Sequence, residues 1–207
     1  MKTIILIRHG QSETNVAKVF TGQLNANLTE TGRAQARLMA QYVDKYDIEK
    51  LYVSSLQRAV DTAQAIIERK NCPMELRDDL QEINSGMWQG LTFEQIAEKF
   101  PDTHMAWKTD FDHATPDGGE TVRELYDRVT TFFKKVLQSK EKTICLVCHA
   151  TPIRIMESYI LGKPAQEIPW VPNASVTVYT YDGNFQCVER GSCDFLGNLS
   201  SNLPKSI

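Results

Sequence analysis

T-I-I-L-I-R-H-G, residues 3–10, passes from a continuous apolar run directly into an arginine and a histidine. A short apolar run without polar alternation is typical of a strand buried on both faces of a parallel sheet. The run is also too short for the apolar region of a signal peptide or for a membrane span. We therefore predict a central strand over Thr3–Ile7 that delivers Arg8, His9 and Gly10 at its carboxyl end.

Strand and helix patterns alternate through the rest of the chain. The predicted elements are, in order, a helix capped by Thr29 and ending near Tyr46, a strand over Lys50–Ser54, a helix capped by Ser54 or Ser55 and reaching Ile67, a weaker strand over Met74–Leu76, short helical pieces such as Phe93–Lys99, an amphipathic helix over Glu120–Gln138, a strand over Thr143–Cys148, a helix reaching Leu161, and a hairpin of Ser175–Tyr181 with Phe185–Arg190. This alternation predicts an α/β fold of three layers, α/β/α, with a mostly parallel central sheet and a C-terminal β-hairpin. We expect a single domain over 1–207, with a cap insertion at about 78–118 and a loose tail over about 197–207.

A second strand also ends in a histidine. Thr143–Cys148 repeats the apolar pattern of the first strand and is followed by His149. Thr151 and Pro152 fit the N-cap and N1 positions of the next helix. Ligands of parallel sheets bind at the edge where the carboxyl ends of the strands meet. We therefore expect His9 and His149 to lie together at that edge.

Charge and cysteine content exclude several classes of protein and partner. The 23 Lys and Arg residues against 26 Asp and Glu give a formal charge of −3, so we expect neither nucleic acid nor a membrane as partner. The 5 cysteines are an odd number in a chain without a secretory signal, which suggests free thiols and a cytoplasmic location. Cys145 and Cys148 have C-x-x-C spacing, but positions i and i+3 of a strand face opposite sides, so we expect buried thiols rather than a metal or redox site. The apolar residues of the closing hairpin could pair two subunits, which leaves a homodimer open.

The polar residues at the sheet edge suit phosphate chemistry. Arg8 and Arg58 carry planar guanidinium groups that match phosphate oxygens, and a neutral imidazole such as that of His9 is a competent nucleophile toward phosphorus. The chain has no G-x-x-x-x-G-K-[ST] loop, no G-x-S-x-G elbow and no G-x-G-x-x-G motif, and His104 and His113 lack the spacing of metal ligands. These observations disfavour nucleotide, acyl-transfer and metal chemistry.

Five blocks of sequence, in order, resemble the histidine phosphatase superfamily, also called the phosphoglycerate mutase-like proteins. The blocks are Arg8-His9-Gly10 with Ser12 and Asn15, Phe20-Thr21-Gly22 with Leu28-Thr29-x-x-Gly32, Ser54-Ser55-x-x-Arg58-Ala59, Glu82 before Gly86-x-Trp88-x-Gly90, and Gly118-Gly119-Glu120 with His149 later in the chain. A single R-H-G would be weak evidence, but five blocks over about residues 2–190 are specific. By this resemblance, Asn15 and the backbone near Thr21 and Gly22 make further phosphate or substrate contacts.

The resemblance also implies the roles of the central residues. His9 accepts the phosphoryl group, and Arg8, Arg58 and His149 form the surrounding oxyanion pocket. Glu82 is the proton donor to the leaving oxygen, so we expect it to be protonated when neutral His9 attacks and to activate water afterwards. Cationic side chains can take the place of Mg²⁺ as the phosphate clamp, so we expect no metal and no cofactor.

The number of cations in the cap separates hydrolysis from mutase activity, because a mutase must hold a second anionic group. Between 91 and 118 the Lys and Arg residues are Lys99 and Lys108 alone, so we expect a phosphatase that acts on a small phosphorylated metabolite. A cofactor-dependent phosphoglycerate mutase stays open as an alternative. A catalytically silent module that binds a phospho-ligand is a third hypothesis.

Overall fold

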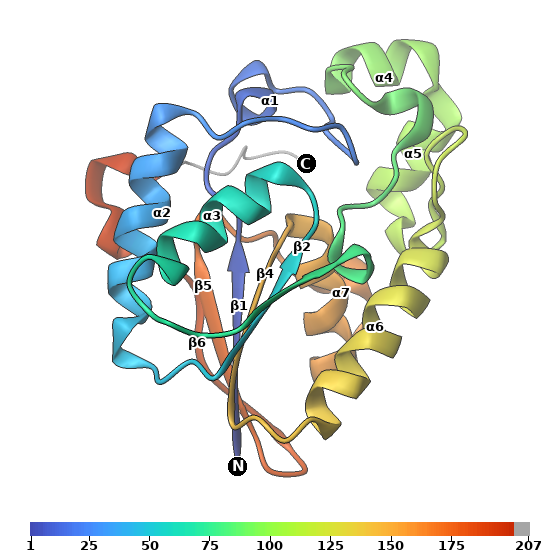
Figure 1. Ribbon diagram of the computed structural model, residues 1–207. Coiled ribbons are helices and arrows are strands. Elements are labelled where there is room, and N and C mark those ends of the chain that lie inside the picture. The colour runs from blue at the N-terminus through green and yellow to red at the C-terminus, as the bar shows by residue number, and fades with distance from the viewer. Residues whose placement is uncertain (201–207) are drawn as a thin grey trace.

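Six strands form one mixed sheet at the centre of the molecule (Figure 1). The computed structural model describes residues 1–200. The strands lie in the order β3-β2-β4-β1-β5-β6. Their bounds are β1 Lys2–Arg8, β2 Lys50–Ser54, β3 Met74–Arg77, β4 Thr143–Cys148, β5 Val176–Tyr181 and β6 Phe185–Ser192. β1 to β4 pair in parallel, and β5 and β6 form the antiparallel hairpin at one edge, so the predicted fold class is confirmed.

Helices cover both faces of the sheet. One face carries α2 (Glu30–Tyr42), continued by η1 (Val43–Lys45), and α3 (Gln57–Ile67), and the other carries α6 (Val122–Gln138) and α7 (Ala150–Leu161). β1 serves both layers, because Ile4 and Leu6 pack in the cluster of α6 and α7 while Ile5 and Ile7 pack in the cluster of α2 and α3. Burial of each such side chain stabilises the fold by about 1.5–3 kcal/mol relative to exposure. The unbroken apolar run of β1 therefore reflects a strand with two buried faces.

The C-x-x-C pair follows the same alternation. Cys145 packs with the α2 and α3 side of the sheet and Cys148 with the α6 and α7 side, and both are fully buried. Burial raises the pKa of both thiols, which keeps them protonated. The prediction that the two sulfur atoms lie on opposite faces is confirmed.

Two helices begin at other residues than predicted. The N-cap of α7 is His149, so Thr151 and Pro152 lie inside the first turn rather than at the N-cap and N1. The N-cap of α3 is Leu56, which has no capping side chain. Ser54 Oγ accepts from the Leu56 N–H over 3.4 Å but lies closer to His149, and the Ser55 hydroxyl binds Asp78. The sequence pattern of a cap cannot reveal a distant side chain that competes for the same hydroxyl group.

The predicted cap is more helical than its sequence suggested. Between β3 and α6 the chain forms η2 (Asp78–Leu80), η3 (Gly86–Trp88), α4 (Phe93–Lys99), α5 (Pro101–Thr109) and η4 (Phe111–His113). Together with the short helix α1 (Glu13–Ala17), which the sequence analysis missed, α4 lies at the end of the molecule toward which β1 points (Figure 1). The cap and the loops after β1 thus surround the carboxyl ends of the parallel strands.

The chain after the hairpin packs back on the first helical layer. η5 (Ala165–Glu167) precedes β5, and η6 (Asp194–Leu199) follows β6 with Leu196 buried. Gln35 of α2 donates to the Leu199 carbonyl over 2.7 Å, so the first residues of the predicted loose tail are ordered. Residues 201–207 of that tail lie outside the described residues. Within residues 1–200, no helix is both long and apolar enough to cross a membrane.

Candidate active site

The two strand-end histidines lie side by side at the sheet edge. β1 and β4 are paired neighbours with Arg8 opposite Cys148, so His9 and His149 leave the sheet at the same level. The centroids of their rings are 5.0 Å apart, and both side chains are buried. The expectation that parallel strand ends bring these two imidazoles together is confirmed.

The hydrogen bonding of His9 defines its tautomer. Nδ1 lies 2.7 Å from the Gly10 carbonyl oxygen, which can only accept, so Nδ1 carries the proton and Nε2 keeps its lone pair. Burial, followed by the nearby Arg58 and Arg8 guanidinium groups, holds the pKa of His9 well below its usual range. His9 therefore presents a neutral nitrogen nucleophile at neutral pH.

Asn173 holds the backbone of His9 in place. Its amide nitrogen donates to the His9 carbonyl over 3.1 Å and to Asn15 Oδ1 over 3.0 Å, and the backbone N–H of Ala174 also donates to the His9 carbonyl over 3.0 Å. Asn15 Oδ1 accepts from Ser12 as well, which leaves the Asn15 amide nitrogen to donate elsewhere. The sequence analysis missed Asn173, whose neighbour Ala174 adopts a left-handed φ of 54°.

The half-buried Arg8 and the buried Arg58 place two cations near these rings. Arg8 Nη1 donates to the Val171 carbonyl over 2.6 Å, while both terminal nitrogens of Arg58 donate to backbone carbonyls. Among residues 1–200, Nε of each arginine is buried without a hydrogen-bond partner. Burial lowers the pKa of each arginine to about 10, which still leaves both charged at neutral pH. Buried cations with unpaired donors create a strong demand for an anion.

The loop that contains Thr21 and Gly22 orients Arg58. The Gly22 carbonyl accepts from Arg58 Nη2 over 2.8 Å, and the Thr21 hydroxyl donates to Thr14 of α1 over 2.8 Å. Gly22 has a φ of 53°, and a side chain there would collide with Ser85. The Gly22 carbonyl therefore holds the guanidinium group of Arg58, while Thr21 ties the same loop to α1.

Glu82 provides the carboxyl group nearest to the two arginines. Its charge raises the pKa of both Arg8 and Arg58, although burial of each arginine is the larger effect. Glu82 is half-buried, and its Oε2 accepts from the Thr151 backbone N–H in the first turn of α7 over 3.4 Å. Glu82 thus contacts the first turn of α7, two residues after His149, and its role as proton donor stays a prediction.

Ser54 determines which nitrogen of His149 can donate. Ser54 Oγ accepts from the Leu56 backbone N–H over 3.4 Å and lies 2.7 Å from His149 Nε2. Among the described residues Nε2 is the one acceptor within reach of the Ser54 hydroxyl hydrogen, so we assign that hydrogen to the Nε2 contact. Nδ1 then carries the proton, and among the described residues this buried nitrogen has no partner. Burial, then Arg58, His9 and Arg8, lowers the pKa of His149 well below its usual range. His149 is therefore a neutral N–H donor.

We expect the buried histidines to make the fold sensitive to acid. Below a pH of about 6.5 the unfolded histidines bind protons while the folded ones stay neutral, so the free energy of unfolding falls as the pH falls, by at most about 1.4 kcal/mol per pH unit for each histidine. Urea denaturation at pH 7.5 and 5.5 measures this loss. His149→Gln should lose less stability between the two pH values than the wild type. Equal losses in both proteins would contradict the prediction.

No cluster of three or more His, Cys, Asp or Glu side chains within residues 1–200 is arranged to hold a metal ion. Of the other two histidines, His113 is exposed and lies 2.7 Å from Asp110, and His104 packs near Phe93 in the cap. The residues at this edge are two imidazoles, two guanidinium groups and one carboxyl group, which come from the end of β1, from α3, from the N-cap of α7 and from the segment after η2.

Comparisons with known proteins agree with this geometry. The family model of the histidine phosphatase superfamily (branch 1) matches residues 4–193. Phosphoserine phosphatase 1 of Hydrogenobacter thermophilus is 34% identical over 163 residues, which cover 78% of this chain and 77% of that protein. Glucosyl-3-phosphoglycerate phosphatase of Mycobacterium tuberculosis is 30% identical over 177 residues, which cover 81% and 79%.

A solved structure extends the agreement to the fold. The mycobacterial glucosyl-3-phosphoglycerate phosphatase in complex with inorganic phosphate has a TM-score of 0.85 against this chain at 26% identity, covering 94% of this chain and 99% of that one. This chain therefore belongs to branch 1 of the histidine phosphatase superfamily.

Proposed function

We propose that this phosphatase hydrolyses a small phosphorylated metabolite through a phosphohistidine intermediate, without a metal ion. The observation that carries the proposal is the pair of arginines, Arg8 and Arg58, whose buried Nε atoms have no partner among the described residues and whose charges act on a neutral imidazole. A phosphoryl group would supply the missing acceptors for Arg8, Arg58 and the Nδ1 proton of His149. Such donors stabilise the charge that develops on the phosphoryl oxygens during transfer.

The reaction runs in two displacements. The lone pair of His9 Nε2 forms a bond to phosphorus while the ester P–O bond breaks, and Glu82 gives its proton to the leaving oxygen. In the second step the Glu82 carboxylate takes a proton from water, the water oxygen bonds to phosphorus, and the P–N bond breaks. Inorganic phosphate leaves, and Glu82 and His9 return to their starting protonation states.

The relatives support a substrate with a carboxylate near the phosphate. Phosphoserine and glucosyl-3-phosphoglycerate, which appear in the relatives' names, are both phosphate esters of acids that carry a carboxylate.

The cap carries few cations. Between residues 91 and 118 the Lys and Arg residues are Lys99 on α4 and Lys108 on α5, and both are exposed. Because a bisphosphorylated intermediate needs more cations than these, hydrolysis is favoured over mutase activity. That two copies of the chain pair as a homodimer stays a prediction.

Phosphate release in the presence of EDTA tests the proposal. The substrates are p-nitrophenyl phosphate and a panel of metabolites that includes phosphoserine and 3-phosphoglycerate, and wild type is compared with His9→Ala. We expect EDTA-resistant release that the substitution abolishes. Interconversion of 3- and 2-phosphoglycerate that depends on added 2,3-bisphosphoglycerate, without release, would instead identify a mutase.

A further inference from the structure

We propose that Arg128 and Glu120 form a brace that positions Glu82 for proton transfer. The inference rests on the function proposed above, in which Glu82 is the general acid. Neither Arg128 nor Glu120 has a hydrogen bond or ion pair with His9, His149 or the two site arginines among the described residues. The Arg128 charge makes a minor contribution to the lowered pKa of His149, and a lysine at this position keeps that charge, so we expect both residues to act through Glu82.

Arg128 holds the backbone on which Glu82 sits. It lies on α6, and its Nη1 donates to the carbonyls of Asp79 and Gln81, both over 2.9 Å. Its Nη2 donates to the carbonyl of Glu82 itself over 3.1 Å. The flat guanidinium group thus binds three carbonyls of one short segment, and a lysine ammonium lacks this geometry.

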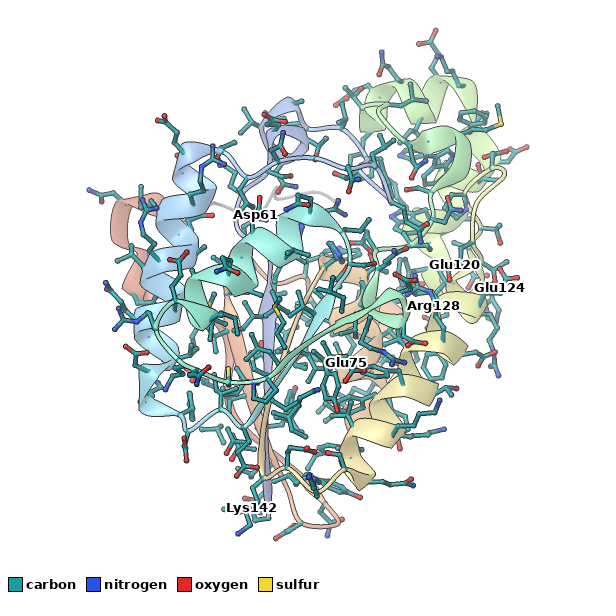
Figure 2. All side chains as sticks on the ribbon, viewed as in Figure 1. Asp61, Glu75, Glu120, Glu124, Arg128 and Lys142 are labelled. Carbon is teal, nitrogen blue, oxygen red and sulfur yellow. The ribbon has the colours of Figure 1, made fainter. Side chains whose placement is uncertain are left out.

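Glu120 completes the brace from the other side. Its carboxylate accepts from Arg128 Nε over 2.6 Å and from Nη2 over 2.9 Å, which is a bidentate pair. Glu120 Oε2 also accepts from the Asn84 backbone N–H over 3.2 Å, and the Glu120 N–H donates to the Asn84 carbonyl over 2.7 Å. Figure 2 shows Glu120 and Arg128 close together beside α6, with Glu124 farther out. The segment is therefore held on both sides of Glu82.

The brace stands on a helix packed into the core, and the Glu82 carboxyl group is held by backbone contacts that include its own segment. α6 buries one face of its length in the core, including Leu125 and Val129 on either side of the Arg128 turn. Glu82 Oε1 accepts from the backbone N–H of the next residue, Ile83, over 2.9 Å, and Oε2 accepts from Thr151 over 3.4 Å. The place of the carboxyl group therefore depends on its backbone. A displacement of about 1 Å at a reacting group can cost about 100-fold in rate.

The leaving group of the substrate distinguishes a positioning role from a purely structural one. Protonation matters most for esters of aliphatic alcohols such as phosphoserine and least for p-nitrophenyl phosphate, whose product is already a stable anion. kcat/KM reports the steps up to loss of the leaving group. A brace that aims the general acid should therefore affect kcat/KM for the two substrates unequally.

The test compares Arg128→Lys and Glu120→Gln with the control Arg123→Lys. Arg123 is an exposed residue of the same helix and pairs with Asp127. We expect both brace variants to lower kcat/KM for phosphoserine, or for the best aliphatic ester of the panel, by about tenfold or more, and for p-nitrophenyl phosphate by less than about threefold. The control should match the wild type on both substrates. Circular dichroism and thermal unfolding verify that each variant is folded. If Arg128→Lys does not fold, Glu120→Gln alone tests whether the brace positions Glu82.

A double variant links the effect to Glu82. In a Glu82→Gln background, Arg128→Lys should no longer lower kcat/KM for the aliphatic ester by more than about twofold, because the group that it positions is gone. Equal losses on both substrates in folded brace variants, or an undiminished loss in the Glu82→Gln background, would overturn the inference. Failure of the proposed function is a different result, since the wild type itself would then release no phosphate or His9→Ala would stay active.

Discussion

Replacement of His9 by glutamine will lower kcat/KM for phosphate release by on the order of 1,000-fold or more, on every substrate that the wild type accepts. Glutamine is close to histidine in size and polarity, but its amide nitrogen has no available lone pair to attack phosphorus. The surrounding donors of Arg8, Arg58 and His149 stay in place, so substrate binding should persist. The loss is therefore expected in turnover rather than in affinity.

Trapping of the phosphoenzyme checks the same prediction by a second readout. Wild type mixed with labelled substrate and quenched in alkali should carry a protein-bound phosphoryl group that acid removes, as expected for phosphohistidine, and His9→Gln should carry none. His113→Gln is a suitable control, because His113 is exposed and bonded only to Asp110. A phosphoenzyme of unchanged amount in His9→Gln would assign the nucleophile to another residue.

Glu82→Gln should produce the second largest effect, and its size should depend on the leaving group. Glutamine preserves a hydrogen-bonding side chain but cannot transfer a proton, and general acid catalysis is worth about 100-fold to 10,000-fold. We therefore expect kcat/KM to fall by about 100-fold or more on an aliphatic phosphate ester and by much less on p-nitrophenyl phosphate. Steady-state kinetics on the two substrates measure the difference.

The control for this variant is Glu98→Gln, which changes an exposed carboxylate of α4 in the same cap. It should match the wild type on both substrates. If Glu82→Gln hydrolysed an aliphatic ester as fast as the wild type, another group would be the proton donor. In that case the brace of Arg128 and Glu120 would have no catalytic consequence.

The sheet and the histidine pair were predictable because their signals are local. A short unbroken apolar run is typical of a strand that is covered on both faces. Two such runs in this chain are each followed closely by a histidine. Parallel pairing then brings His9 and His149 to the same edge without further information. Cys145 and Cys148 lie on opposite faces of the sheet because successive side chains of a strand alternate between its two faces.

The helix starts and the small helices were less predictable, because they depend on competition between partners. Ser54 and Ser55 have the chemistry of N-cap residues, but their hydroxyl groups bind His149 and Asp78 from other parts of the chain. The short helix α1 has no buried residue and is stabilised by a capping box at Ser12, a pattern too brief for periodicity to reveal.

The amino-acid sequence alone was sufficient for the α/β layers, the two strand-end histidines and the arginines beside them, since apolar periodicity and strand ends depend on near neighbours in the chain. Three-dimensional contacts were needed for the protonated nitrogen of each ring, for Asn173 behind His9 and for the brace behind Glu82. Except for the contact of His9 with the neighbouring Gly10 carbonyl, each of these depends on a hydrogen bond between residues far apart in sequence. Hydrogen bonds between such distant residues form only when the packed core brings their helices and strands together.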